Sequence, residues 1–503
     1  MRHQQFSGLR TRREFIRQAA CAAVGTAALS CAIRDLRFMN AAVAQSNITD
    51  YKALVCIFLA GGNDSNNLVI PTIQSEYDNY AAIRTPVLAI PLSGSPYNIL
   101  KLDNEGGVDY TPLNSDGHEY GLHPASPELR TLFGEGKLAV LFNTGTLVFP
   151  MTRAEYKGGI LQKPPQLFSH ADQVTQWQTS VPNRPALTGW GGRCADLLAS
   201  VQPNAPISLS VSLAGANTFE VGNIVSQYSV STSGAIALSL PSSGATARQA
   251  ALTNILGLPY GNLQAQAYAG VAKHAINTSA LLNNAIAPTS VSTYWAAPFP
   301  ATITPPTGGA AFTSNLSAQL KMIARLIEAG HRSAANGGFG MKRQIFFCSV
   351  GGYDLHTNQT KLLSPGVFDT TQGSHTNLLA EISQCFFAFQ RAMEQLGLSN
   401  NVTAFTASDF GRTFPSNGQG SDHGWGSHHL ILGGAVNGRR TYGKFPALTI
   451  NGPDDTSTGR WIPTTACDQY FATLATWFGV DNNHLATVFP NLGNFSASSL
   501  GFI

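Results

Sequence analysis

Four short apolar segments, each leading into a loop with glycine or an acidic residue, most constrain the fold. They are YKALVCIFLAGGND (51–64), KLAVLFNTGT (137–146), RQIFFCSVGGYD (343–354) and NVTAFTASDFG (401–411). Each apolar run is too short for a typical helix, and such a run is typical of a strand that is buried on both faces. The sequence therefore predicts a sheet with parallel strands at its centre.

Amphipathic helices separate these strands along the chain. Segment 314–333 follows a serine or asparagine cap, and segment 374–397 ends at a glycine. Strands that alternate with helices predict an α/β fold with a mostly parallel, doubly wound sheet. In such sheets, sites form beyond the carboxyl ends of the strands, where the acidic clusters of this chain fall.

Two regions differ from this core. Residues 200–312 alternate like exposed β-hairpin strands and end in a Pro/Gly-rich linker, which predicts a β-rich or helical insertion or cap between core segments 45–199 and 313–503. Residues 1–44 contain Arg12 and Arg13 before a mild apolar stretch and small residues at 42–44. This segment resembles a twin-arginine export signal cleaved near Ala44. It implies a periplasmic or extracellular protein that meets the twin-arginine translocase, and lipidation at Cys31 stays open.

The composition argues against several function classes. Charged residues are 12% of the chain, the net charge is +3, and no basic stripe is interleaved with aromatic residues, so nucleic acid is not an expected partner. No apolar run approaches the ~18 residues of a stable membrane span. The cysteines form no CxxC motif, which argues against a thiol-redox or zinc-thiolate site.

Carboxylates and histidines follow two of the predicted strands closely. Asp64 comes after two glycines, where it can bind a divalent cation or close a turn through its own backbone. Asp354 and His356 are two residues apart, so on an extended chain they point the same way and can reach one metal ion. A purely structural role stays open for each.

The densest cluster is SDHGWGSHH, residues 421–429. Asp422 and His423 are adjacent, and His428 follows five positions later, so imidazole and carboxylate donors suited to a transition metal lie close together in sequence. A strand that begins at His429 would place that side chain opposite His428, which makes His428 the better ligand. Which of these residues bind the metal stays open.

Two further positions are candidates for catalysis. Arg412 follows Asp409, the acid that ends the fourth strand, and can either neutralise it or hold a substrate oxyanion. Ser169 precedes a predicted helix with Asp172 in its first turn. A serine there is either an N-cap or a nucleophile that gains from the positive end of the helix dipole.

Taken in order, these strings resemble a family of twin-arginine-exported bacterial proteins known as domain of unknown function 1501. The ordered motifs are GGND, HP, SHADQ…WQT, GGYDLH, SDFGRT, DHG and LGGAV, and they cover nearly the whole chain after the leader. That family is similar to the alkaline phosphatase and sulfatase superfamily. The likeness implies an α/β/α sandwich that holds metal ions at the carboxyl ends of its strands.

The resemblance also implies a role for each candidate. One metal site would use Asp354 with His356, and the other Asp409 with Asp422 or His423. Asp64 would be the metal ligand that follows the first strand, and His428 a further ligand of that metal. Ser169 would be the nucleophile, and Arg412 would stabilise charge on the substrate. The spacing of these acids and histidines departs from the superfamily pattern, so one metal site can have been lost.

We therefore expect an exported, sulfatase-like hydrolase of phosphate or sulfate esters. Its cofactors would be one or two divalent ions (zinc, manganese or calcium), and its substrate a small-molecule or polysaccharide ester. One alternative is a non-catalytic envelope or binding protein with a vestigial metal site. A second is an SGNH-like carboxyl esterase, because GGND is similar to a block of that family, although the other blocks are not in the right place.

Overall fold

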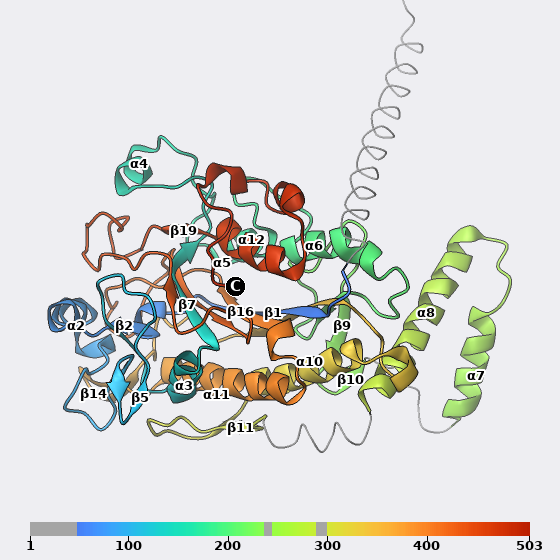
Figure 1. Cartoon of the computed structure of the whole chain (residues 1–503), viewed down its shortest axis with the longest axis horizontal. Coiled ribbons are helices and arrows are strands. Elements are labelled where there is room, and N and C mark those ends of the chain that lie inside the picture. The colour runs from blue at the N-terminus through green and yellow to red at the C-terminus, as the bar shows by residue number, and fades with distance from the viewer. Residues whose placement is uncertain (1–47, 236–243, 288–298) are drawn as a thin grey trace, which may run out of the picture.

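The structure is a computed structural model that describes residues 48–235, 244–287 and 299–503 (Figure 1). The predicted export signal, residues 1–44 with Cys31, lies outside the described residues. Among the helices that are described, none combines the length and the apolar character needed to cross a membrane.

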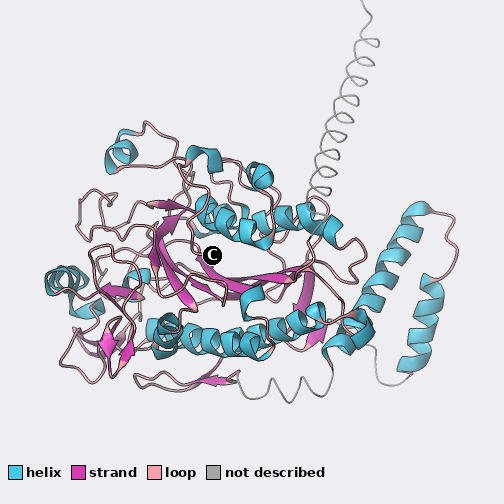
Figure 2. Cartoon of the chain, in the orientation of Figure 1, coloured by secondary structure: helices cyan, strands magenta, loops and turns pink. Residues whose placement is uncertain are grey.

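A ten-stranded sheet lies at the centre and contains all four strands predicted from the sequence (Figure 2). Parallel pairs dominate; β17 runs against both of its neighbours, and β9 and β10 form a hairpin. The predicted fold class, α/β with a mostly parallel sheet, is confirmed. The strands, in spatial order, are β10 (Gly234–Ala235), β9 (Tyr228–Ser231), β8 (Ser210–Ser212), β13 (Arg343–Val350), β1 (Lys52–Leu59), β16 (Val402–Ser408), β17 (Ser427–Leu432), β7 (Leu138–Gly145) and β18 (Thr441–Tyr442), with β19 (Thr465–Ala466) also on β7.

Helices cover both faces of the sheet and make three layers (Figure 1). Along β1, alternate side chains enter the two opposite cores, which explains why this strand is apolar throughout rather than alternating. One face carries α3 (Pro127–Gly134), α10 (Asn315–His331) and α11 (Ser374–Gln395); the other carries α5 (His170–Thr179), α6 (Trp190–Leu198), α12 (Cys467–Phe478) and α13 (Leu485–Val488).

The remaining elements lie around this core. Near one end of the sheet are α2 (Gln74–Leu88), β2 (Val69–Pro71), β3 (Leu100–Lys101), β4 (Asn104–Glu105), β5 (Val108–Asp109), β6 (Tyr120–Leu122), β14 (Lys361–Ser364) and β15 (Val367–Asp369). Elsewhere lie α4 (Arg153–Gly158), α7 (Ala245–Leu256), α8 (Leu263–Ile286), β11 (Thr302–Ile303) and β12 (Phe312–Thr313).

The region 200–312 differs in part from the exposed hairpins expected there. Strand β8 pairs in parallel with β13, and β9 pairs in parallel with β8, so this region extends the main sheet. Antiparallel pairs of consecutive strands are also present among the described residues: β9 with β10, and the short β11 with β12 at the end of the region. Helices α7 and α8 then project from that side of the molecule (Figure 1).

The register of β1 defines one edge of the sheet. Its last residue, Leu59, pairs with Val350 of β13 on one side and with Ser408 of β16 on the other, so three parallel strands end level. Strand β7 has the same direction as β16, because each pairs antiparallel with β17. The loops that follow β1, β7, β13 and β16, and the loop that precedes β17, therefore meet at this edge.

Two adjacent histidines of β17 are buried on opposite sides of the sheet. The ring of His428 contacts Phe142, and that of His429 contacts Trp177, with ring centroids 5.1 and 4.8 Å apart. Burial lowers the pKa of each histidine to about 3. Both are therefore neutral in the folded protein at neutral pH.

These two histidines should make the protein less stable in mild acid. The unfolded chain binds a proton at each below about pH 6.5, whereas the folded chain does so only near pH 3, so the free energy of unfolding falls as the pH falls between these values. Each histidine should contribute a slope of about 1.4 kcal/mol per pH unit. In urea titrations between pH 6 and 4.5, His429→Gln should reduce the total slope by about that amount. An unchanged slope would contradict the assignment.

Candidate metal centre

The loops at the shared edge of the sheet pack closely because glycine follows β1. The backbone nitrogen of Gly61 donates to Asp409 Oδ1 at 3.0 Å. Gly61 has a φ of +118°, and a Cβ there would overlap the backbone nitrogen of Asp354. Only a residue without a side chain allows the loops after β1 and β13 to approach this closely.

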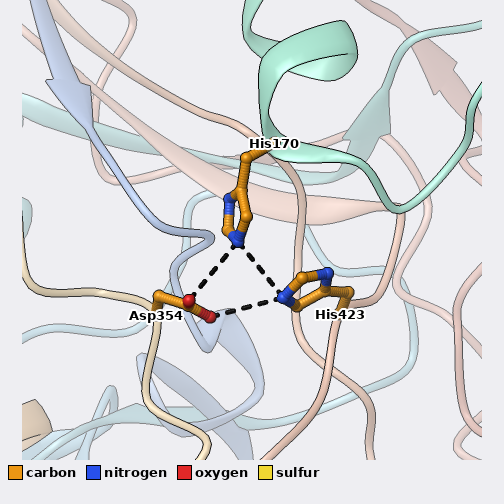
Figure 3. Close-up of side chains that lie close together, drawn as sticks. All are labelled: His170, Asp354 and His423. Carbon is orange, nitrogen blue, oxygen red and sulfur yellow. Dashed lines mark hydrogen bonds and ion pairs between the residues drawn. The ribbon is translucent and has the colours of Figure 1, made fainter.

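His170, Asp354 and His423 direct their side chains at one point, although His170 begins α5 and the other two come from the loops after β13 and before β17 (Figure 3). The Nε2 atoms of the two histidines are 3.1 Å apart, and they lie 3.5 and 3.4 Å from carboxylate oxygens of Asp354. His356 joins them, with its Nε2 at 3.0 Å from His423 Nε2 and 3.1 Å from Asp354 Oδ1. Donor atoms around a tetrahedral zinc ion are separated by ~3.3 Å, given Zn–N bonds of ~2.0–2.1 Å.

The tautomer of His423 is set by a backbone carbonyl. Its Nδ1 lies 2.7 Å from the oxygen of Phe168, which can only accept, so Nδ1 carries a proton. In the neutral ring, Nε2 therefore presents a lone pair to the cluster. Phe168 holds this position with a φ of +71°, which is rare for a bulky residue and typical of backbone strain at functional sites.

Carboxylates orient the other two imidazoles in the same way. His170 Nδ1 is 2.7 Å from Asp409 Oδ2, and His356 Nδ1 is 2.9 Å from Asp422 Oδ1. A proton on each Nδ1 satisfies these contacts and leaves both Nε2 lone pairs facing His423. Such a carboxylate behind a histidine is the usual support of a metal ligand.

The charges favour the metal-binding forms of these groups. Burial, the guanidinium of Arg412 and the neighbouring His170 lower the pKa of His423, against the hydrogen bond to Phe168 and the charge of Asp354. Burial acts to raise the pKa of Asp354, but the hydrogen bond and charge of Arg412 bring it below its ordinary value. A neutral imidazole beside an ionised carboxylate is the state that binds a divalent ion.

The Nε2 lone pairs of His170, His356 and His423 face one another without a proton between them, so they repel unless a cation lies among them. Within the described parts of the chain, His170, Asp354 and His423 are the group whose donor atoms are close enough to hold a metal ion. Three imidazoles and one carboxylate suit zinc or manganese better than calcium, which prefers oxygen donors. The side chains of the four residues are 24–46% exposed, so the centre is open on one side.

Arg412 lies beneath this centre rather than facing solvent. Its buried guanidinium donates to Asp354 Oδ1 at 2.8 Å and to Gly61 O at 3.2 Å, and it also contacts Ser421 O. Both terminal nitrogens of Arg412 therefore already donate to groups of the protein. Arg412 is thus positioned to orient Asp354, and the expectation that it contacts a substrate oxyanion does not agree with its burial.

Asp64 and His428 lie outside the cluster. The carboxylate of Asp64, 2% exposed, pairs with Arg84 of α2 and accepts from Gln359. Burial acts to raise the pKa of Asp64, but the charge of Arg84 holds it below its ordinary value. His428 Nδ1 accepts from the backbone nitrogen of Asn143 at 3.1 Å, so its proton is on Nε2 and neither nitrogen offers a free lone pair.

Ser169 and His170 occupy the start of α5. Ser169 is the N-cap residue, but its hydroxyl donates to Asp172 Oδ2 at 2.6 Å instead of capping the helix backbone. His170, the next residue, is absent from the ligands predicted from the sequence. The available signal was its place in SHADQ, beside the proposed nucleophile and at a helix start.

The comparisons with known proteins agree with the predicted family. Residues 324–485 match the model described as "Protein of unknown function (DUF1501)", which is the family indicated by the ordered motifs. Among curated proteins, none matches this chain.

Several solved structures are similar at low identity. They include a sulfatase from Pseudoalteromonas sp. (10% identity, 89% of this chain and 72% of that one, TM-score 0.29) and a phosphonate monoester hydrolase from Silicibacter pomeroyi (10%, 71% and 68%, 0.29). A third is a Bacteroides thetaiotaomicron protein described in a study of glycosaminoglycan metabolism (12%, 86% and 74%, 0.31). At these TM-scores the superpositions assign no residue of the centre.

The buried pair of Asp64 and Arg84 should be important for stability. In Arg84→Met the carboxylate stays buried without its partner, so the free energy of unfolding should fall by about 3–5 kcal/mol. In the double variant Arg84→Met/Asp64→Asn no charge remains unpaired, and most of this loss should be recovered. Urea unfolding measures both. A double variant no more stable than Arg84→Met would contradict the pairing.

Proposed function

We propose that this protein is a metal-dependent hydrolase of phosphate or sulfate esters, with its ion held by His170, Asp354, His356 and His423. The observation that carries the proposal is the convergence of three imidazole Nε2 atoms, each within 3.1 Å of another, beside one carboxylate. Asp409 and Asp422 then act behind the ligands, as acceptors that fix two imidazoles, rather than as ligands themselves.

One ion per chain is the expected stoichiometry. The resemblance to two-metal enzymes implies a second cation near Asp64, but Arg84 already neutralises that buried carboxylate. Arg412 likewise places a guanidinium against Asp354 on the buried side. A second divalent ion would have to displace an arginine from a buried ion pair, which is costly.

An open metal centre is suited to hydrolysis. A bound divalent ion supplies a Lewis acid there, which polarises the ester and lowers the pKa of bound water. Ser169 is a candidate nucleophile because its chain neighbour is the ligand His170, and its hydroxyl already donates a hydrogen bond to Asp172 Oδ2 at 2.6 Å. Attack would form the bond from serine oxygen to phosphorus or sulfur and break the ester bond, with Asp172 taking the serine proton and the alcohol leaving as its alkoxide, which takes a proton from water. A water molecule would then cleave the serine ester and release phosphate or sulfate.

The setting of the reaction is proposed from the sequence. The twin-arginine pattern at Arg12 and Arg13 supports export in folded form through the twin-arginine translocase. An ion held by histidines that are far apart in the sequence requires a folded chain, which suits a route that carries folded proteins. We therefore place the substrate, a small-molecule or polysaccharide ester, in the periplasm or outside the cell.

Metal analysis combined with a substrate panel tests this function. The purified protein should contain about one zinc or manganese ion per chain, and His423→Ala should lose it. Asp409→Asn, which removes only the acceptor behind His170, should weaken metal affinity by about 10- to 100-fold. Ser169→Ala should keep the metal but lose turnover if serine is the nucleophile, and keep turnover if bound water is.

The panel should contain aryl phosphate monoesters, phosphate diesters, aryl sulfates and an aryl acetate. Chelator-sensitive cleavage of a phosphate or sulfate ester supports the proposal. A protein that binds metal but cleaves none of these would favour the envelope or binding protein. Cleavage of the acetate alone, unaffected by chelator, would favour the carboxyl esterase.

A further inference from the structure

A second arginine, Arg460, lies beside the metal centre on a loop that one buried acid holds in shape. Asp455, fully buried, accepts from the backbone nitrogens of Ser457, Gly459 and Arg460 at 3.0, 2.8 and 3.1 Å. A bridge between Asp455 and Trp461 closes the loop. The backbone of Arg460 is therefore fixed by several hydrogen bonds.

The side chain of Arg460 packs on the segments that support His423. Its Nε donates to the backbone oxygen of His423 at 2.8 Å. Its guanidinium carbon lies 4.3 Å from the ring centroid of Phe168, the residue whose carbonyl fixes His423 Nδ1. Stacking and one hydrogen bond thus hold the guanidinium against Phe168 and the backbone of the ligand His423.

The terminal nitrogens of Arg460 donate no hydrogen bond to the described residues, unlike those of Arg412. Among the described residues none accepts a hydrogen bond from either nitrogen, and no carboxylate forms an ion pair with this guanidinium. The side chain is partly exposed.

We propose that Arg460 binds the non-bridging oxygens of the ester substrate and so selects esters of tetrahedral oxyanions. The proposal rests on the proposed function, because it assigns a substrate-binding residue to the same centre. A planar guanidinium with two free N–H groups donates to two oxygens of a phosphate or sulfate group at once. Its fixed stem means that little side-chain entropy is lost on binding.

The test uses the metal-loaded full chain with inorganic phosphate and inorganic sulfate as separate probes. Titration calorimetry should give an affinity for one or both anions, and the stronger of the two identifies the ester class. Arg460→Met, which keeps the stem over Phe168, should weaken that binding by about 10- to 100-fold. Arg460→Lys should recover part of it, since one charge remains without the planar fork.

Arg153→Met is the matched control. Arg153 reaches the same loop, with Nε on Asp455 O at 2.9 Å, but its Nη2 is already used by Asn451 Oδ1 at 2.9 Å. This variant should bind the anion like the unaltered protein. Metal content, measured in every variant, should stay near one ion per chain in Arg460→Met.

Three results of the binding and metal measurements would overturn the assignment of Arg460, and a kinetic result would do so as well. They are anion affinity unchanged in Arg460→Met, loss of the metal in that variant, which would make Arg460 a support of His423, and no binding of either anion by the unaltered protein. If the protein binds the anion through Arg460 but cleaves no ester, the assignment of Arg460 stands and the hydrolase function fails. If Arg460→Met turns over with an unchanged Michaelis constant, the hydrolase function stands and the assignment of Arg460 fails.

Discussion

The level ending of three parallel strands is the constraint on which the rest of the structure depends. Because Leu59 pairs with both Val350 and Ser408, the loops after β1, β13 and β16 leave the sheet at the same height. A shift of one residue in either pair would move a loop by ~3.3 Å along the strand direction and turn its side chains to the opposite face. The four donor groups would then no longer meet.

Charge compensation decides where a metal ion can bind at this edge. Three carboxylates lie within or just behind the cluster, and a fourth is buried at Asp64. Arginines neutralise two of these four carboxylates, at Asp64 and Asp354, whereas the Nε2 atoms of the cluster face one another with no cation among the described residues. The two carboxylates without an arginine, Asp409 and Asp422, lie against the Nδ1 atoms of His170 and His356. The place left for a cation is therefore the point where the three Nε2 atoms and Asp354 meet, which is the physical reason for expecting one ion.

Much of the fold could be predicted from the sequence because strands that are buried on both faces of a sheet have continuous apolar sequences. The same runs ended in the loops that carry Asp354, His356 and His423, and these three side chains do lie together. Their convergence followed from strand direction alone. The site could be anticipated to that extent.

The other candidates depended on contacts that sequence spacing does not reveal. Asp64 has its buried partner on α2, and the environment of His428 depends on which face of β17 it occupies and on a register shift between Ser427 and His429. His170 reaches the centre only because the chain returns from β7 to the start of α5. Position in sequence could not distinguish Arg412, whose hydrogen bonds are all internal, from Arg460, whose terminal nitrogens are free.

X-ray absorption at the zinc edge tests the central claim most directly, because it reads the ligands of the ion itself. The zinc-loaded protein should show imidazole scattering from three histidines, with nitrogen and oxygen donors at ~2.0–2.1 Å. His170→Ala, which changes a ligand found only through the structure, should remove one imidazole from that shell. A shell made of water oxygens, or one that His170→Ala leaves unchanged, would contradict the account.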